Sequence, residues 1–582
     1  MMSDSPRWRA ISALVFTLLV AACGRSGDDA TNALRNAGGI LGYVPADTPY
    51  VFATPERLPD DVREKLEASA DSMYAAYQTV IEASFGDVAA ELEIQGDAEE
   101  AELVMTLASE FVGLMQSDNL RAAGVPASPY SAIYGVGLLP VLRLELSNPV
   151  AFDAKIAELE ANAGGEMSVG EVEGVSYRFV GDDSGRIIIA IIDDYVVATI
   201  APTALSDEQL ANVLGINKPD ASIAESGALE SLAEAYGFAA YGLGYVDMMR
   251  VVNVFLDSPT GVNAEMLSMM EFDASSVSDI CKTEIREVAG IMPRFAAGYT
   301  DVSATEIGSN TIFELRSDIA TGMSALAAPV PGLGSDHGGL GSFGLSIDLL
   351  AAREFAEARL DAFEADPYEC EYFQDMALTA AQMRMSLNQP VPPIAYGTKG
   401  FLAVIDRIEG LDMSGQRPPE EVDARVLLAN DNAAGLLAMG AMFSPELAAL
   451  DLPDDGTPVA LDVPQLTGQF GAAYLAMTNG ALGVSIGNGD PAKLSDLLNS
   501  APADPPPSMS MRLDGERYYN FMSEAVQAGN AASPEADQAS PEVQAALSQV
   551  MSGIGDMIER IAVDITFTER GIEMPATLTL AD

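Results

Sequence analysis

The feature that most constrains the fold of this chain is an internal repeat. A proline-rich segment that leads into β-rich sequence occurs at residues 126–135 and again at residues 390–397. Further along, the apolar strands and turn of residues 189–197 are matched by residues 474–482, and both copies continue into a segment of helical period. We interpret this repeat as the duplication of one ancestral half.

A smaller unit also recurs, consisting of a short strand, an aspartate and a helical segment. The aspartates are Asp247, Asp348 and Asp514. The short carboxylate of aspartate accepts hydrogen bonds from the free N–H groups of a helix's first turn. We therefore predict that each of the three residues is the N-cap of the helix that follows it.

These patterns predict an α+β protein with two pseudo-symmetric halves, each a largely antiparallel sheet packed with helices. A Pro/Gly-rich stretch separates the halves, as is typical of linkers. The predicted organisation is a signal peptide (1–22), a lipidated cysteine with a flexible tether (23–41), a first half (42–320), a linker (321–341) and a second half (342–582).

The charge of the chain excludes whole classes of partner. Thirty basic residues face 86 acidic ones, a formal net charge of −56. Nucleic acids and anionic lipid headgroups would be repelled by such a surface. We interpret the acidic excess as side chains that keep the protein surface hydrated. The alternative is that they bind cations or a basic partner.

The N-terminus has the layout of an export signal. Arg7 and Arg9 precede an apolar run, residues 11–20, and two small residues lead to Cys23. The run is too short to span a membrane. The sequence Leu19-Val20-Ala21-Ala22-Cys23 resembles the lipobox of bacterial lipoproteins, which implies that a diacylated Cys23 becomes the new N-terminus. With a non-acidic residue after the cysteine, the resemblance also implies an outer-membrane protein anchored by its acyl chains and facing the periplasm, with the cell surface as the alternative.

The remaining cysteines are consistent with export. If Cys23 is lipidated, Cys281 and Cys370 form a single pair in an oxidising compartment, and we predict a disulfide between them. The alternative is two buried free thiols. Two thiols and the single histidine, His337, do not provide a structural zinc site of the usual kind, so we expect neither a metal site nor a cofactor.

A second resemblance involves short motifs in the first half. They are the Pro-Ala-Asp-Thr-Pro opening (45–49), the Glu-Gly-Val-Ser-Tyr strand (173–177), the Asp-Asp-Tyr-Val-Val hairpin (193–197) and the Ser-Ile-Ala-Glu-Ser segment (222–226). Together they are similar to a widespread family of exported bacterial proteins catalogued as a domain of unknown function. The likeness is mainly to residues 42–256, and it implies an extracytoplasmic location.

One motif suggests a serine hydrolase. Residues 483–487 match G-x-S-x-G, which would place Ser485 on a nucleophile elbow. His337, however, precedes this serine, whereas the elbow fold requires the histidine after it. The matching strand of the first copy has no glycines, so we interpret Ser485 as a strand residue and expect no enzymatic activity.

Two other patterns have simpler explanations than ligand binding. The G-x-G-x-x-G of residues 339–344 comes before a strand, whereas a phosphate-binding loop requires these glycines after one. The acidic clusters at Asp182-Asp183, at Asp193-Asp194 and at Asp451 with Asp454-Asp455 lack the spacing of a calcium loop. We therefore predict that they are turn residues, with a structural Ca²⁺ site as the alternative.

The functional prediction is therefore a lipid-anchored envelope protein with a non-enzymatic binding or scaffolding role. The first alternative is a carrier of an apolar ligand such as lipid, since methionines at helical spacing could line an adaptable groove. The second alternative is a hydrolase that uses Ser485. The expected partners are the membrane, through Cys23, and either an envelope protein or an apolar ligand, but not nucleic acid.

Overall fold

The computed structural model has an α+β fold, which confirms the predicted class. Its strands and helices fall into two compact units, described separately below. Unit 1 comprises residues 1–275, 297–309 and 539–553, and unit 2 comprises residues 276–296, 310–538 and 554–582. The structure describes residues 34, 39–95, 113, 116–162, 166–182, 184–257, 259–410, 419–463, 467, 468, 470–532 and 540–581.

Unit 1 contains an antiparallel sheet in the order β4-β5-β6-β7-β3-β2-β1-β8. Its strands are β1 (Tyr50–Thr54), β2 (Ser131–Val136), β3 (Leu139–Glu145), β4 (Ser168–Val172), β5 (Val175–Gly181), β6 (Gly185–Ile192), β7 (Tyr195–Pro202) and β8 (Leu243–Asp247). The helical elements are η2 (Leu41–Tyr43), α3 (Asp60–Gln95), α5 (Ser117–Ala122), α6 (Pro149–Asn162), α7 (Asp207–Leu214), α8 (Ile223–Ser226), α9 (Ala228–Tyr236), α10 (Met248–Leu256) and α11 (Val262–Met269).

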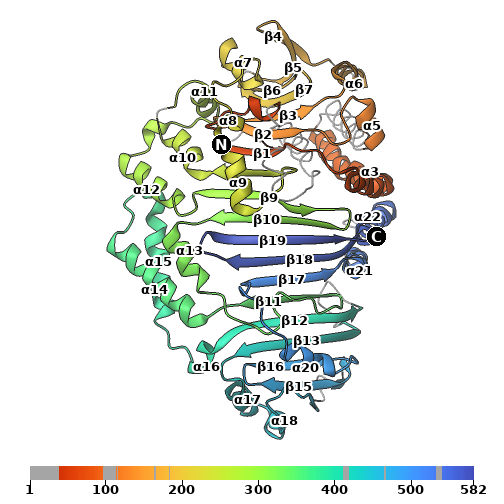
Figure 1. Cartoon of the computed structure of the whole chain (residues 1–582), viewed down its shortest axis with the longest axis vertical. Coiled ribbons are helices and arrows are strands. Elements are labelled where there is room, and N and C mark those ends of the chain that lie inside the picture. The colour runs from red at the N-terminus through yellow and green to blue at the C-terminus, as the bar shows by residue number, and fades with distance from the viewer. Residues whose placement is uncertain are drawn as a thin grey trace. The chain divides into compact units, whose positions relative to one another are not determined.

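The strands of unit 2 also pair antiparallel, in the order β14-β15-β16-β13-β12-β11-β17-β18-β19 (Figure 1). Its strands are β11 (Gly341–Ser346), β12 (Thr398–Glu409), β13 (Glu421–Asn430), β14 (Val459–Ala460), β15 (Ala473–Thr478), β16 (Ala481–Ile486), β17 (Met509–Asp514), β18 (Ile558–Phe567) and β19 (Gly571–Leu580).

The helices of unit 2 include α12 (Asp279–Ala289), α13 (Ser317–Ser324), α14 (Leu349–Ala365), η4 (Glu371–Phe373), α15 (Gln374–Leu387), α16 (Pro393–Tyr396), α17 (Ala433–Ala441), α18 (Pro445–Ala448), α20 (Ala492–Leu498) and α21 (Gly515–Ala532). Four elements have residues in both units: η3 (Ala274–Ser276), β9 (Arg294–Val302), β10 (Glu306–Glu314) and α22 (Pro541–Met557).

The two sheets share a pairing order. In unit 1, β7-β3-β2-β1-β8 are neighbours, with β1 first in the chain and a hairpin, β2-β3, next to it. In unit 2, β16-β13-β12-β11-β17 are neighbours, with β11 first and the hairpin β12-β13 next to it. The two sets of strands therefore follow the same sequence of pairings along the chain.

The Pro/Gly-rich stretch before β11 is part of the core of unit 2. Val330 and Leu333, within the predicted linker 321–341, are each 1% exposed and pack with Leu402, Val404 and Leu427. Residue 344 is a glycine because a Cβ there would lie 2.6 Å from Leu333. The bounds of the two compact units differ from those of the predicted halves, 42–320 and 342–582. The two halves therefore remain a prediction.

The three predicted N-caps are confirmed. The carboxylate of Asp247 accepts a hydrogen bond from the Arg250 N–H at the start of α10. Asp348 accepts from two backbone N–H groups of α14, and Asp514 accepts from the N–H of Arg517 in α21. Short polar side chains thus start the helix after each strand, as the sequence pattern indicates.

Candidate functional site

The strands in the middle of the unit 2 sheet have one face that is fully buried. Leu402, Val404 and Leu427 alternate along β12 and β13 and are each no more than 1% exposed. They pack with Leu494, Leu497 and Leu498 of α20 and with the stretch before β11. This face supplies the hydrophobic core of unit 2.

The opposite face of the same strands is also apolar, and its residues lie in register across the sheet. Phe343 lies opposite Ala403 of β12, which lies opposite Val426 of β13. Directly opposed residues of paired strands share a face. Following this register from β16 to β19 defines what we call the apolar face: Phe343, Leu345, Phe401, Ala403, Ile405, Ala424, Val426, Leu428, Leu482, Val484, Ile486, Met509, Met511, Leu513, Ile561, Val563, Ile565, Ala576 and Leu578.

The exposed fractions show that this face is uncovered. Phe343 is 40% exposed, Leu345 38%, Ile405 37% and Val426 40%, although neighbours in the same rows shield the sides of each residue. The remaining residues of the apolar face are partly exposed, whereas Val404, on the other face of β12, is 0% exposed. In the part of the chain that the structure describes, nothing covers the centre of the apolar face.

Charged groups lie at both ends of the strands. On β12, the Lys399 ammonium lies 2.8 Å from an Asp348 oxygen and 3.3 Å from an Asp431 oxygen. The hydrogen bond from Lys399 lowers the pKa of Asp348 and raises that of Lys399. At the other end, Arg407 pairs with Glu409, Glu421 and Asp423. The Lys399 cluster therefore lies at one end of the apolar residues of β12, whereas the register places Arg407 and Asp423 on the other face of the sheet.

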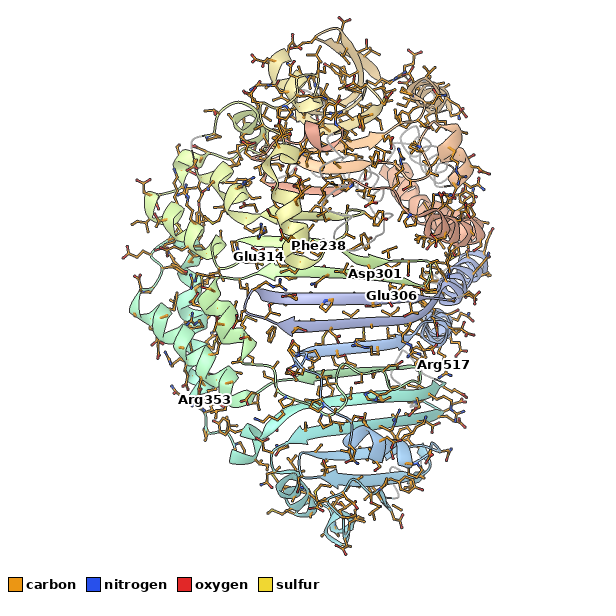
Figure 2. The ribbon with its side chains drawn as sticks, viewed as in Figure 1. Phe238, Asp301, Glu306, Glu314, Arg353 and Arg517 are labelled. Atoms are coloured by element: carbon orange, nitrogen blue, oxygen red, sulfur yellow. A yellow bond between two sulfur atoms is a disulfide. The ribbon has the colours of Figure 1, made fainter. Side chains whose placement is uncertain are left out.

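Helices flank the strand ends. Figure 2 labels Arg353 on α14 and Arg517 on α21, at opposite ends of the unit 2 strands. Arg353 donates hydrogen bonds to Glu357 and to the Tyr396 hydroxyl, and Arg517 lies 3.9 Å from Asp514. These guanidinium groups are held by partners close to the strand ends, which places further charge around the apolar face rather than on it.

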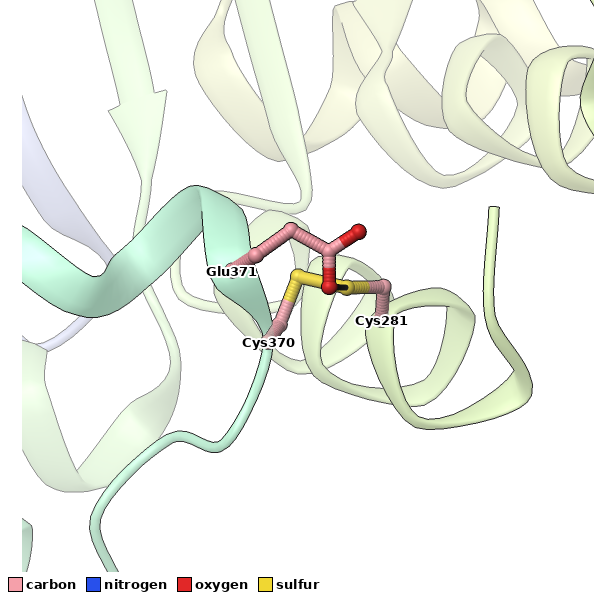
Figure 3. Close-up of side chains that lie close together, drawn as sticks. All are labelled: Cys281, Cys370 and Glu371. Carbon is pink, nitrogen blue, oxygen red and sulfur yellow. Dashed lines mark hydrogen bonds between the residues drawn. A yellow bond between two sulfur atoms is a disulfide. The ribbon is translucent and has the colours of Figure 1, made fainter. Parts of the chain in front are cut away.

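The predicted disulfide is present. Cys281 of α12 and Cys370, just before η4, are joined with a Cα–Cα distance of 4.7 Å (Figure 3). The Glu284 carboxylate accepts hydrogen bonds from the N–H groups of Glu369 and Cys370, which holds the two segments together. A Glu371 carboxylate oxygen lies 3.5 Å from the Cys281 sulfur. Since the sulfurs are bonded to each other, they are not available as thiolate ligands for a metal.

A hollow lies beside the disulfide. Its lining includes the carboxylates of Asp279, Glu284, Glu287 and Asp366, together with Tyr368. Burial and the nearby Glu287 charge raise the pKa of Tyr368. Glu284 already accepts two backbone N–H groups there, so the acidic lining has a structural use.

Ser485 lies inside strand β16, not on a turn between a strand and a helix. It borders a small hollow with Asp406, Arg425 and Lys493, in which both cations pair with Asp406. The ring of His337 is hydrogen-bonded to the carbonyl oxygen of Gly332. This geometry gives Ser485 no activating histidine among the described contacts, and we assign it no catalytic role.

The motifs of the first half come together in unit 1 as structural contacts. The Tyr43 hydroxyl donates a 2.6 Å hydrogen bond to Asp193, and the Arg143 guanidinium carbon lies 3.8 Å from the centre of the Tyr43 ring. Pro45 pairs with Ser222, whose capping box with Glu225 begins α8. Pro45, Asp193 and Ser222 of these motifs therefore help to hold the N-terminal segment, the β6-β7 turn and α8 together.

The aspartates of two acidic clusters accept hydrogen bonds within their own turns. Asp182 accepts hydrogen bonds from Ser184 and from the Gly185 N–H, which lowers the pKa of Asp182. Asp455 accepts from the Thr457 N–H and has a lowered pKa for the same reason. The predicted turn roles of these two aspartates are confirmed, whereas Asp183 lies outside the described residues.

The apolar face is the feature that the sequence prediction missed. Continuous apolar runs, such as residues 401–405 and 426–429, are typical of strands with two apolar faces. The alternative prediction, a carrier of an apolar ligand, instead placed a groove at methionines with helical spacing, of which Met439 lies on α17 and Met442 just after it. The predicted lipid anchor, Cys23, and its signal peptide lie outside the described residues.

No family model matches the chain, and no curated protein or solved structure matches it either. Among the described residues, no helix combines the length and apolar character needed to span a bilayer.

Proposed function

We propose that this chain is a non-enzymatic binding protein of the bacterial envelope, anchored through lipidated Cys23, whose binding surface is the apolar face of unit 2. The observation that carries the proposal is the exposure of Phe343, Leu345, Ile405 and Val426, each between 37% and 40%, at the centre of an apolar surface. Large exposed apolar patches on soluble folds mark binding sites.

The size of the patch supports this proposal. Seven strands, β16 to β19 in spatial order, span about 29 Å at the usual strand spacing, and five residues along a strand span about 17 Å. The apolar face is thus about 500 Å², near the upper end of what a typical monomer exposes. Keeping so much apolar surface in water is unfavourable at about 25 cal/mol per Å², which favours a surface kept for an occupant.

The repeat supports a common origin for the two sheets. We infer that the chain arose by duplication, because the pairing order β7-β3-β2-β1-β8 recurs as β16-β13-β12-β11-β17. The duplicated strands would then provide the structural scaffold. The apolar face of unit 2 would be the part that acquired a binding function.

Photo-crosslinking in cells tests whether the apolar face is occupied. Leu345 and Val426 are each replaced by benzoylphenylalanine, and matched variants carry it at Leu378 and Val150, which are 62% and 79% exposed elsewhere. We expect ultraviolet-dependent adducts from the first two positions and severalfold less from the matched pair. Equal or absent adducts from all four positions would refute the proposed binding surface.

The anchor has its own test. We expect an alkyne analogue of palmitate to label the wild-type protein and a Cys370→Ala variant, but not a Cys23→Ala variant, because only Cys23 follows the lipobox. Label that persists in the Cys23→Ala variant would exclude this mode of anchoring.

A further inference from the structure

The chemistry of the apolar face restricts what can occupy it. Its side chains are aliphatic or thioether groups with two aromatic rings, Phe343 and Phe401, whose centroids lie 5.9 Å apart. None of the residues that define the face carries a hydroxyl, amide or charged group, and the backbone groups of its strands are engaged in strand pairing. An occupant therefore gains nothing from hydrogen-bonding groups of its own.

A protein partner fits this surface poorly. Protein interfaces carry about one hydrogen bond per 100–200 Å², and their strongest contacts come from tryptophan, tyrosine and arginine. The apolar face offers none of these three residue types. Acyl chains, in contrast, need only apolar contact area.

A second copy of the chain fits no better. Two apolar faces of about 500 Å² each would bury about 1,000 Å², less than the 1,200–2,000 Å² of a standard stable interface. Each copy also carries a formal charge of −56, so that two copies repel each other. Self-association through this face is therefore disfavoured by both area and charge.

The charges at the strand ends indicate the headgroup. Lys399 lies between Asp348 and Asp431, so one end of β12 presents both signs of charge. Together with the acidic excess of the chain, this arrangement disfavours an anionic headgroup. A zwitterionic headgroup can pair its cation with the carboxylates and its phosphate with the Lys399 ammonium group.

Resting on the proposed function, we infer that the occupant of the apolar face is the acyl chains of a zwitterionic phospholipid.

The same crosslinking variants test this inference when cells are labelled with ³²P-phosphate. Phosphate labels phospholipids but not the acyl chains on Cys23, so the anchor gives no background. We expect ³²P on the protein after irradiation from positions 345 and 426, severalfold more than from positions 378 and 150. Chromatography of the released headgroup should identify the headgroup of phosphatidylethanolamine rather than that of phosphatidylglycerol.

The other outcomes separate the two proposals. A crosslinked protein, or a dimer of this chain, from positions 345 and 426 would overturn the lipid inference and leave the binding surface intact. An anionic lipid as the main adduct would overturn the headgroup assignment. No adduct of any kind from these positions would overturn both proposals. Far-ultraviolet circular dichroism of each purified variant shows whether it is folded before its result is used.

Discussion

The two faces of the unit 2 sheet are made by the same strands but have different uses. On β12, Leu402 and Val404 are at most 1% exposed, whereas Ile405 is 37% exposed on the other side. Both faces are apolar, so composition does not distinguish them. What differs is that α20 and residues 328–340 cover one face, while the other lies between helices at the strand ends.

This difference separates stability from binding. Residues under α20 contribute to folding because their apolar area leaves water in the folded chain itself. Residues of the apolar face leave water only when an occupant arrives, so their contribution appears in binding. Substitutions on the two faces should therefore change different measurements.

The largest effect on stability should come from a bond that belongs to neither face. The Cys281–Cys370 disulfide joins residues 89 positions apart, and closing a loop of that length stabilises by about 4 to 5 kcal/mol in the chain-entropy model. We expect a Cys281→Ala/Cys370→Ala variant to lose about that much in urea unfolding, while benzoylphenylalanine at position 345 crosslinks as before. Loss of crosslinking from a folded variant would show that the disulfide also shapes the apolar face.

A matched pair of arginines gives the next largest difference. Arg425 is 5% exposed and makes two hydrogen bonds to Asp406, whereas Arg407 is exposed at the end of β12. Removing one partner of a buried ion pair costs about 3 to 5 kcal/mol, and surface pairs contribute about 0 to 1 kcal/mol. We expect Arg425→Met to lower the free energy of unfolding by about 3 kcal/mol or more and Arg407→Met by less than about 1 kcal/mol. Equal losses would contradict the assignment of Arg425 to the core and of Arg407 to the surface.

Leucines make the same comparison without charge. Leu427 is 0% exposed and Leu345 is 38% exposed. We expect Leu427→Ala to cost about 2 to 5 kcal/mol in urea unfolding, because it leaves a cavity in the core, and Leu345→Ala to cost about 0.5 kcal/mol or less. A large loss for Leu345→Ala would mean that the apolar face is covered in solution.

The smallest effect should come from the ion pair at the edge of the apolar face. The pKa of Asp348 is lowered and that of Lys399 is raised by their hydrogen bond. The resulting stability is present above the ordinary pKa of aspartate, about 4, and is lost as pH falls through the lowered value. It is also lost as pH rises through the raised value of Lys399, above about 10.

We therefore expect Lys399→Met to be less stable than wild type by about 0.2 to 1 kcal/mol near pH 7. The difference should shrink below about pH 4, when Asp348 becomes protonated. Urea unfolding at several pH values measures this, with Lys282→Met on α12 as the control. A difference that is constant down to pH 2 would exclude the ion pair as its source.

Much of the local structure followed from the sequence. The strands expected within residues 189–197 are parts of β6 and β7, and their copies within residues 474–482 are parts of β15 and β16. The Asp N-caps and the pairing of Cys281 with Cys370 were also predicted correctly. These features depend on alternation, short-range hydrogen bonds and the number of cysteines, which the order of residues records directly.

The α+β class, the repeated strands, the three Asp N-caps and the disulfide partners thus follow from the order of residues. Which apolar residues are covered depends on the tertiary packing. Phe401 to Ile405 is an uninterrupted apolar run, and nothing in it indicates that Leu402 and Val404 meet α20 while Ile405 meets solvent. Covering a face depends on where helices distant in the chain come to lie, and an apolar pattern has the same form whether its neighbour is a helix or a ligand.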